Sequence, residues 1–171
     1  MNLLPSSALM IYFNEYELTH KTRGNKICHF FGVPGVTLSL LGLLSHAVLW
    51  SPLPASESAL TAFSMGLFSS NIPLFQVDLG IILLAFAAVF SIRIDFKLSI
   101  PYLLALYFGY LTFRHLSLPV LIGIQLISWI FQFVGHYRFE KKSPAFFKNL
   151  ESLLIGPLWI FAYGIGYYRP T

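Results

Sequence analysis

Residues Ile27–Trp50, ICHFFGVPGVTLSLLGLLSHAVLW, decide the fold, because this stretch contains no Asp, Glu, Lys or Arg. A helix of about 20 apolar residues crosses the roughly 30 Å hydrocarbon core of a bilayer, so this stretch predicts a transmembrane span. Other apolar runs predict further spans at about 74–92, 98–113 and 116–136. The run 153–168 is weaker, because its Gly and Pro residues break helices, and it is expected either to span or to lie in the interface.

The composition agrees with a membrane protein. Of the 171 residues 11% are charged and 56% are apolar, and the mean hydropathy is +0.70. Soluble domains carry about 25% charged residues, so this chain has too little polar surface for water. We predict an all-α fold, a polytopic transmembrane helical bundle of four to five spans, with residues 1–171 forming a single membrane domain. The net charge of +4 combines 11 basic with 7 acidic residues, which is not the balance of a nucleic-acid-binding protein.

Basic residues predict the topology. Three basic groups lie on one side if the spans alternate: Lys21, Arg23 and Lys26; Arg93 and Lys97; Arg138, Lys141, Lys142 and Lys148. The opposite loops carry only Glu57, Arg114 and His115. Because cytoplasmic loops are enriched in Lys and Arg, residues 1–26 are predicted to be a cytoplasmic segment. The Pro- and Ser-rich residues 51–73 are expected to form a loop, with a short interfacial helix near 59–68.

This topology brings three histidines to one membrane face. His20 and His29 lie near the start of the first span and His136 lies at the end of the fourth. Residues 24–25 are expected to break the helix and fold His20 back. His136 and Glu140 are four residues apart and share a face of a continued helix. Imidazole and carboxylate ligands with open positions suit non-haem Fe(II).

Each of the polar residues in and near this predicted metal site also has a purely structural interpretation. A histidine at the membrane edge also serves as an interfacial hydrogen-bonding residue, and Glu140 also fits a solvated charged turn. His46 is expected to hydrogen-bond between helices, and the single cysteine, Cys28, to pack. Asp78 lies at headgroup depth or is a functional acid. The polar residues of the fourth span line a channel or join helices: Gln125, Ser128 and Gln132.

Three segments carry a family resemblance. Residues 16–34 contain the pattern Tyr16-x3-His20-x4-Asn25-x3-His29-x4-Pro34. Residues 129–150 contain Trp129-x2-QFVGH-x3-Glu140, followed by Lys141, Lys142 and Pro144-Ala145. Residues 153–159 read LLIGPLW. Together these segments resemble the small membrane family of 2-hydroxy-fatty-acid dioxygenases, named for fungal conversion of phytosphingosine to odd-numbered fatty acids, and the resemblance extends over nearly the whole chain. The short tails suggest a prokaryotic member.

The resemblance implies an Fe(II)-dependent dioxygenase of fatty acid α-oxidation, which uses O2 to shorten a 2-hydroxy fatty acid by one carbon. Its iron ligands would be His20, His29 and His136. Glu140 would be a fourth ligand, an orienter of His136 or a loop charge, and with Lys141 it is the predicted catalytic pair. Predicted second-shell groups are Asn25 and Gln132, and predicted partners of the substrate carboxylate are Arg138 and Lys142.

The resemblance also implies where the protein works. The enzyme would lie in the bilayer that dissolves its substrate, in the cell inner membrane of a prokaryote or the endoplasmic reticulum of a eukaryote, with the site facing the cytoplasm. A homo-oligomer is compatible with the sequence. Two other functions stay open: a non-catalytic lipid-binding or assembly protein, and a small transporter whose path is lined by Asp78, His46 and Gln125.

Overall fold

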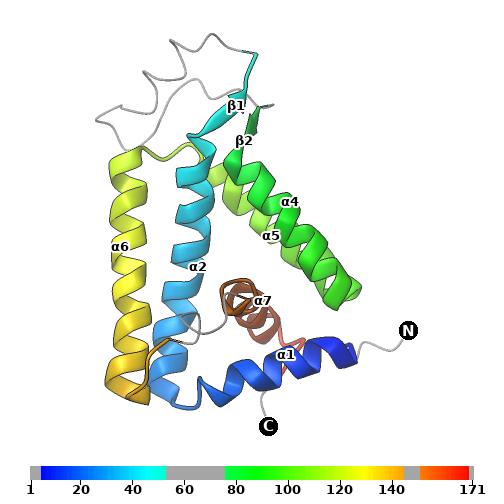
Figure 1. Cartoon of the computed structure of the whole chain (residues 1–171), viewed down its shortest axis with the longest axis vertical. Coiled ribbons are helices and arrows are strands. Elements are labelled where there is room, and N and C mark those ends of the chain that lie inside the picture. Colours follow the sequence, from blue (N-terminus) through cyan, green and yellow to red (C-terminus); the bar gives the residue numbers. More distant parts are fainter. Residues whose placement is uncertain (1–4, 53–75, 145–150, 170–171) are drawn as a thin grey trace.

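The computed structural model describes residues 5–52, 76–144 and 151–169. Four helices run alternately up and down between the two ends of the molecule (Figure 1): α2 (Arg23–Ser45), α4 (Leu79–Ile94), α5 (Phe96–Phe113) and α6 (Leu118–Val134). Two shorter helices, α1 (Ser7–Leu18) and α7 (Ser152–Gly164), lie across one end of this bundle. The predicted interfacial helix near 59–68 lies outside the described residues.

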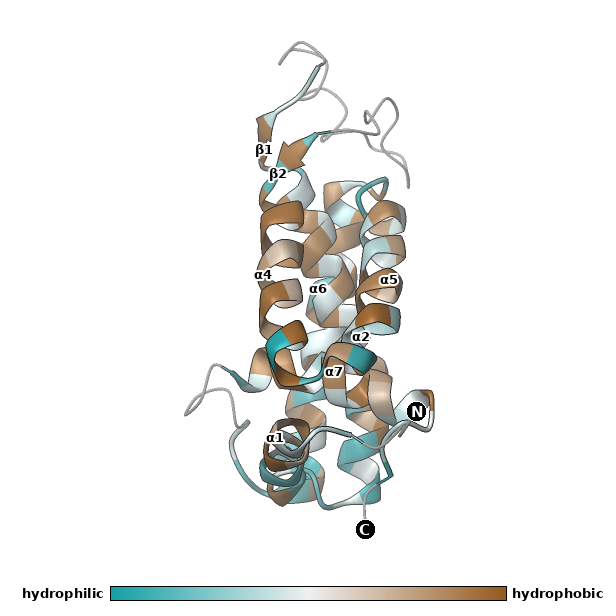
Figure 2. Cartoon of the chain, turned by 90° about the vertical axis from the view of Figure 1, so that its right-hand side faces the viewer, coloured by the Kyte–Doolittle hydropathy of each residue, from teal (hydrophilic) through white to brown (hydrophobic). Residues whose placement is uncertain are grey.

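The bundle is that of an integral membrane protein, and the predicted all-α class is confirmed. Three described helices are long and apolar enough to cross a bilayer: Arg23–Ser45, Phe96–Phe113 and Leu118–Glu140. The apolar helix α4 has 16 residues and α7 has 13, so α7 is shorter than the run 153–168 that predicted it. Figure 2 shows hydrophobic residues along the bundle and hydrophilic residues gathered around α1 and the adjacent end of α2.

Several element ends differ from the prediction. The first span ends as helix at Ser45, and the following Val48–Trp50 forms strand β1, which pairs antiparallel with β2 (Val77–Asp78). The sequence reasoning missed this strand pair. Another prediction was wrong: residues 24–25 do not break a helix but lie in the first turn of α2, whose N-cap is Thr22. The chain turns at residues 19–22 instead, from α1 into α2, which lies across it (Figure 1).

Small residues bring α2 and α6 close together. A Cβ atom added at Gly32 would lie 3.0 Å from the carbonyl oxygen of Ser128, and one added at Gly35 would overlap the Ser128 hydroxyl. Farther along, the Ser39 hydroxyl hydrogen-bonds to Gln125. Small residues at such spacing let two helix backbones approach closely. This matters in a membrane, because lipid is as apolar as the side chains, and apolar burial alone gives little preference for contact with another helix. This contact determines how the metal-site ends of the two helices meet.

Asp95 fastens α1 to the rest of the bundle. Its carboxylate caps α5 by accepting from the Leu98 amide at 3.0 Å. It also accepts from the Ser6 amide at 2.8 Å, while the Ser6 hydroxyl donates to the Ile94 carbonyl at 2.6 Å. The Tyr167 hydroxyl lies 3.3 Å from the same carboxylate. The turn between α4 and α5 thus holds both the start of α1 and the segment after α7.

Candidate metal centre

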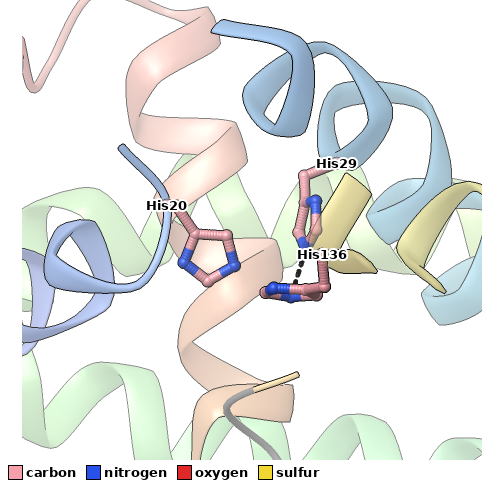
Figure 3. Close-up of side chains that lie close together, drawn as sticks. All are labelled: His20, His29 and His136. Atoms are coloured by element: carbon pink, nitrogen blue, oxygen red, sulfur yellow. Dashed lines mark hydrogen bonds between the residues drawn. The ribbon is translucent and has the colours of Figure 1, made fainter. Parts of the chain in front are cut away.

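Three buried histidines from three separate segments meet at the α1 end of the bundle (Figure 3). His20 lies in the connection between α1 and α2, His29 lies in the second turn of α2, and His136 lies in η1, a π-helix over Gly135–Glu140. One potential ligand atom from each lies within 4.8 Å of the others. The closest pair is Nε2 of His29 and Nε2 of His136, 3.1 Å apart.

Main-chain carbonyls orient two of these rings. The Nδ1–H of His20 donates to the Tyr16 carbonyl at 2.7 Å, and the Nδ1–H of His29 donates to the Asn25 carbonyl at 3.0 Å. Because a carbonyl only accepts, each bond places the proton on Nδ1 and leaves a lone pair on Nε2. A metal-binding histidine is commonly held in this way. Tyr16 also stacks on the His20 ring, with 3.8 Å between ring centroids.

His20 is neutral at physiological pH. The pKa of its imidazole is lowered to about 3, mainly by burial and in smaller part by the nearby His136 and Lys26, against the opposing hydrogen bond to the Tyr16 carbonyl. The neutral form is the form that binds a metal.

The donor set fits a metal ion. A metal bound to imidazole nitrogens at about 2.1 Å places two such nitrogens roughly 3–3.5 Å apart in tetrahedral or octahedral geometry. The 3.1 Å separation of the His29 and His136 nitrogens matches that spacing. Three imidazole nitrogen donors leave positions free for other ligands, and imidazole serves iron, zinc and manganese.

Glu140 joins η1 to the start of α2. One of its oxygens accepts from the Thr22 amide at 2.7 Å, the Thr22 hydroxyl at 3.0 Å and the Asn25 side-chain amide at 3.3 Å. A carboxylate at a helix N-terminus also meets the favourable end of the helix dipole. The bonds place His136, four residues earlier, against His29. Sequence reasoning missed Thr22, although a threonine just before a helix is a usual N-cap signal.

The other predicted site residues lie at different depths. The Asn25 side chain is fully buried and bonds to Glu140, while its carbonyl holds His29. Gln132 is also buried and lines the same cavity as the histidines. Arg138, Lys141 and Lys142 are exposed. Lys141 ends η1 with a φ of 55°, and its catalytic role stays a prediction.

Two cavities open at the centre. A small one, of about 50 Å³, is lined by the three histidines together with residues of α2, α6 and α7. A larger one, of about 630 Å³, lies between α1, the 142–144 segment and α7, and Lys142 lines it. Tyr16 and Ser152 line both, so they stand at the boundary between the metal centre and the larger cavity.

The groups proposed for a transport path have separate structural partners. Asp78 caps α4 and accepts from the Tyr110 hydroxyl at 2.6 Å. His46, the C-cap of α2, bonds through Nε2 at 3.1 Å to the carbonyl of Leu116 in the connection between α5 and α6, and not to another helix as expected. Gln125 pairs with Ser39 between α2 and α6. These bonds favour structural roles for the polar groups of the spans.

Comparison with known proteins identifies the family. Residues 7–167 match the model of the family described as 2-hydroxy-palmitic acid dioxygenase Mpo1-like. The chain belongs to this Mpo1-like family. It is 29% identical over 161 residues to the 2-hydroxy-palmitic acid dioxygenase MPO1 of Saccharomyces cerevisiae, an alignment that covers 89% of this chain and 78% of the yeast protein. No solved structure matches the chain. Membership of the Mpo1-like family makes the chain an enzyme, and the family match includes all three clustered histidines.

Proposed function

We propose that this chain is an Fe(II)-dependent dioxygenase that shortens 2-hydroxy fatty acids by one carbon, with His20, His29 and His136 as its metal ligands. The observation that carries the proposal is the meeting of these three buried imidazoles in a chain of the Mpo1-like family. The substrates are a 2-hydroxy fatty acid and O2, and the carboxyl carbon is released. When bound, iron supplies open positions where the hydroxy acid and O2 meet.

The protein residues hold and orient the reactants. Tyr16 and the carbonyls of residues 16 and 25 keep two ligand rings fixed, and Glu140 acts as a positioning residue for His136. Arg138, Lys141 and Lys142 are exposed, Lys142 lines the larger cavity beside the histidines, and in this proposal the three form a cationic rim of the site. The rim attracts the carboxylate head of the substrate by charge.

Gln132 contacts the substrate head. Its side-chain nitrogen is buried, and among the described residues it has no hydrogen-bond partner, although it lines the cavity of the histidines. An unpaired buried amide costs about 1–3 kcal/mol, so a ligand oxygen in the cavity is a favourable partner. The N–H of Gln132 donates to a hydroxyl or carboxylate oxygen of the substrate.

Metal loading and turnover test the proposal together. The purified protein is reconstituted with Fe(II) without oxygen, its metal content is measured, and oxygen uptake is then followed with 2-hydroxypalmitate. We expect about one iron per chain and substrate-dependent oxygen uptake, both lost in His136→Ala. His115→Ala, which changes an exposed histidine at the opposite end of the bundle, is the matched control. Iron-free protein, or uptake unaffected by His136→Ala, contradicts the proposal.

The site faces the cytoplasm in this proposal, as the basic residues predict. The single native cysteine, Cys28, is buried, so Lys142→Cys introduces an exposed thiol beside the site. In sealed vesicles of inner membrane (or endoplasmic reticulum for a eukaryotic chain), a membrane-impermeant maleimide should label it only from the cytoplasmic side. Labelling from the opposite side would reverse the orientation.

A further inference from the structure

The cavity that holds the histidines continues into an apolar part between α2, α6 and α7. Beyond the histidines its lining includes Val33 and Val36 of α2, Trp129 of α6, and Leu153 of α7. On α2, residues 29, 33, 36 and 37 share one face, so the lining follows this helix away from His29 toward the middle of the bundle. The metal centre therefore opens toward the membrane interior as well as toward the larger cavity at the α1 end.

A second cavity adjoins the first. It measures about 150 Å³ and is lined almost wholly by apolar side chains of α2, α5 and α7, including Leu38, Tyr102, Leu106 and Phe161. Thr37 and Pro157 line both this cavity and the one at the histidines. These two residues stand at the boundary between the two cavities, and we refer to them as the waist. In Figure 1, α7 lies between α2 and the α4–α5 pair.

We propose that the acyl tail of the substrate runs from the metal centre past the waist into the cavity between α2, α5 and α7, and that the waist selects the chain length. This inference rests on the proposed function, because it takes the occupant to be the tail of a 2-hydroxy fatty acid. The choice of occupant follows from continuity: the apolar space begins at the metal ligands, and Thr37 and Pro157 join it to a second cavity that is lined almost wholly by apolar side chains.

The waist residues suit selection by length. Thr37 and Pro157 are half-buried side chains on two different helices, and the Thr37 hydroxyl is already bonded to the Val33 carbonyl at 2.9 Å. The hydroxyl therefore needs no partner from the tail, and its methyl group is free to contact methylenes. Tails that end before the waist gain nothing from the second cavity, whereas longer tails bury additional methylenes in it.

The main experiment locates the tail without requiring turnover. Metal-loaded protein in detergent is irradiated with 2-hydroxypalmitic acid that carries a diazirine on its last carbon, and the labelled peptides are identified by mass spectrometry. We expect labels on the α5 and α7 residues around Tyr102 and Phe161, and their loss when unlabelled 2-hydroxypalmitate is added. Competed labelling confined to other surfaces, such as the outer face of α4, overturns the proposal.

Two variants test the length selection from different helices. Thr37→Phe narrows the waist from α2, and Ala105→Phe fills the second cavity from α5. If each variant excludes two to three methylenes, kcat/KM for 2-hydroxypalmitate should fall by roughly 15- to 60-fold, because each buried methylene contributes about fourfold. Activity on 2-hydroxyoctanoate should stay near that of the unaltered protein. Leu40→Phe, which adds the same ring to the exposed face of α2, is the matched control.

The outcomes separate this inference from the proposed function. If both variants change kcat/KM for 2-hydroxypalmitate and for 2-hydroxyoctanoate by the same factor, or change neither, the tail does not pass the waist. If the unaltered iron-loaded protein consumes neither acid, the proposed function fails, and the competed labelling alone then decides whether a fatty acid tail occupies the cavity.

Discussion

Gly135 is the position at which one methyl group should disturb the metal centre most. This glycine begins η1, one residue before His136. A Cβ atom added there would lie 3.1 Å from Cβ of Cys28 and 3.1 Å from Nδ1 of His29, and closer still to the side-chain oxygen of Asn25. Since favourable carbon contacts need about 3.5–4.0 Å, η1 and α2 must separate by roughly 0.5 Å in Gly135→Ala.

The size of the effect follows from these distances. Overpacking lowers the free energy of unfolding by about 1–3 kcal/mol. The higher helix propensity of alanine raises it by at most about 1 kcal/mol, so we expect a net decrease of about 1–2 kcal/mol. Two imidazole nitrogens bound to one ion at about 2.1 Å are at most about 4.2 Å apart. Starting from 3.1 Å between the nitrogens of His29 and His136, the shift distorts the site without abolishing it. Metal affinity should fall about 10- to 100-fold, as for other changes around metal ligands.

The assay compares two alanine variants of the same helical segment. Gly123 lies in α6, and a Cβ atom added there meets nothing within 4 Å, so Gly123→Ala should leave metal affinity unchanged and slightly raise stability. Each purified variant is titrated with Co(II) as a spectroscopic probe, and thermal unfolding is followed with and without metal. Equal Co(II) affinities for the two variants would refute the close approach of η1 and α2 inferred from the structure.

Three further predictions concern residues that hold the centre or its substrate. Asp95→Asn weakens the attachment of α1 and should lower the free energy of unfolding by about 1–3 kcal/mol, measured by thermal unfolding. Loss of iron affinity should follow, because α1 leads into His20. Glu140→Gln removes the charge that joins η1 to α2 and should lower iron affinity about tenfold; equal affinity in Glu140→Gln and the exposed control Glu15→Gln would argue against this role. Gln132→Leu should raise KM for 2-hydroxypalmitate about tenfold while iron content is unchanged, and a drop in iron content instead would make Gln132 a support of the ligands.

Sequence patterns predicted the bundle well because they reflect the membrane itself. An uncharged run such as Ile27–Trp50 must satisfy its backbone hydrogen bonds within the bilayer, which favours a helix. Basic residues in the connecting segments then bias the orientation of the helices across the membrane. That orientation brought His20, His29 and His136 to one membrane face, and the structure brings the three within metal-binding distance. The ends of the elements were less predictable, because caps such as Thr22 act over a single turn.

The remaining features depend on contacts between distant parts of the chain. Glu140 meets Thr22 across 118 positions, and Asp95 meets Ser6 across 89. No periodicity or spacing in a single sequence indicates that these residues meet. The small residues of α2 were visible as Gly and Ser, but which of them face α6 depends on helix rotation, and this rotation is determined by packing. The turn at residues 19–22, which places His20, follows from such contacts and not from a local breaker at 24–25.

The closest contact of the centre leads to a last prediction about His136. Because the Nδ1–H of His29 donates to the Asn25 carbonyl, its Nε2 carries a lone pair. The Nε2 of His136 lies 3.1 Å away, and two lone pairs would repel at that distance. In metal-free protein, His136 must therefore hold its proton on Nε2 and donate it to His29. A metal ion needs both lone pairs, so binding should move the His136 proton to Nδ1 or release it.

Nitrogen-15 NMR of histidine-labelled protein distinguishes these states, because the two tautomers give different chemical shifts. Metal-free protein should show His136 protonated on Nε2, and Zn(II), a diamagnetic probe, should remove that signal while His115 stays unchanged. His29 should keep its Nδ1 proton in both states, since the Asn25 carbonyl still accepts it. An Nε2 proton that persists on His136 after Zn(II) has bound would mean that Nε2 of this histidine is not a ligand atom, and the pairing of the His29 and His136 Nε2 atoms at one metal would be refuted.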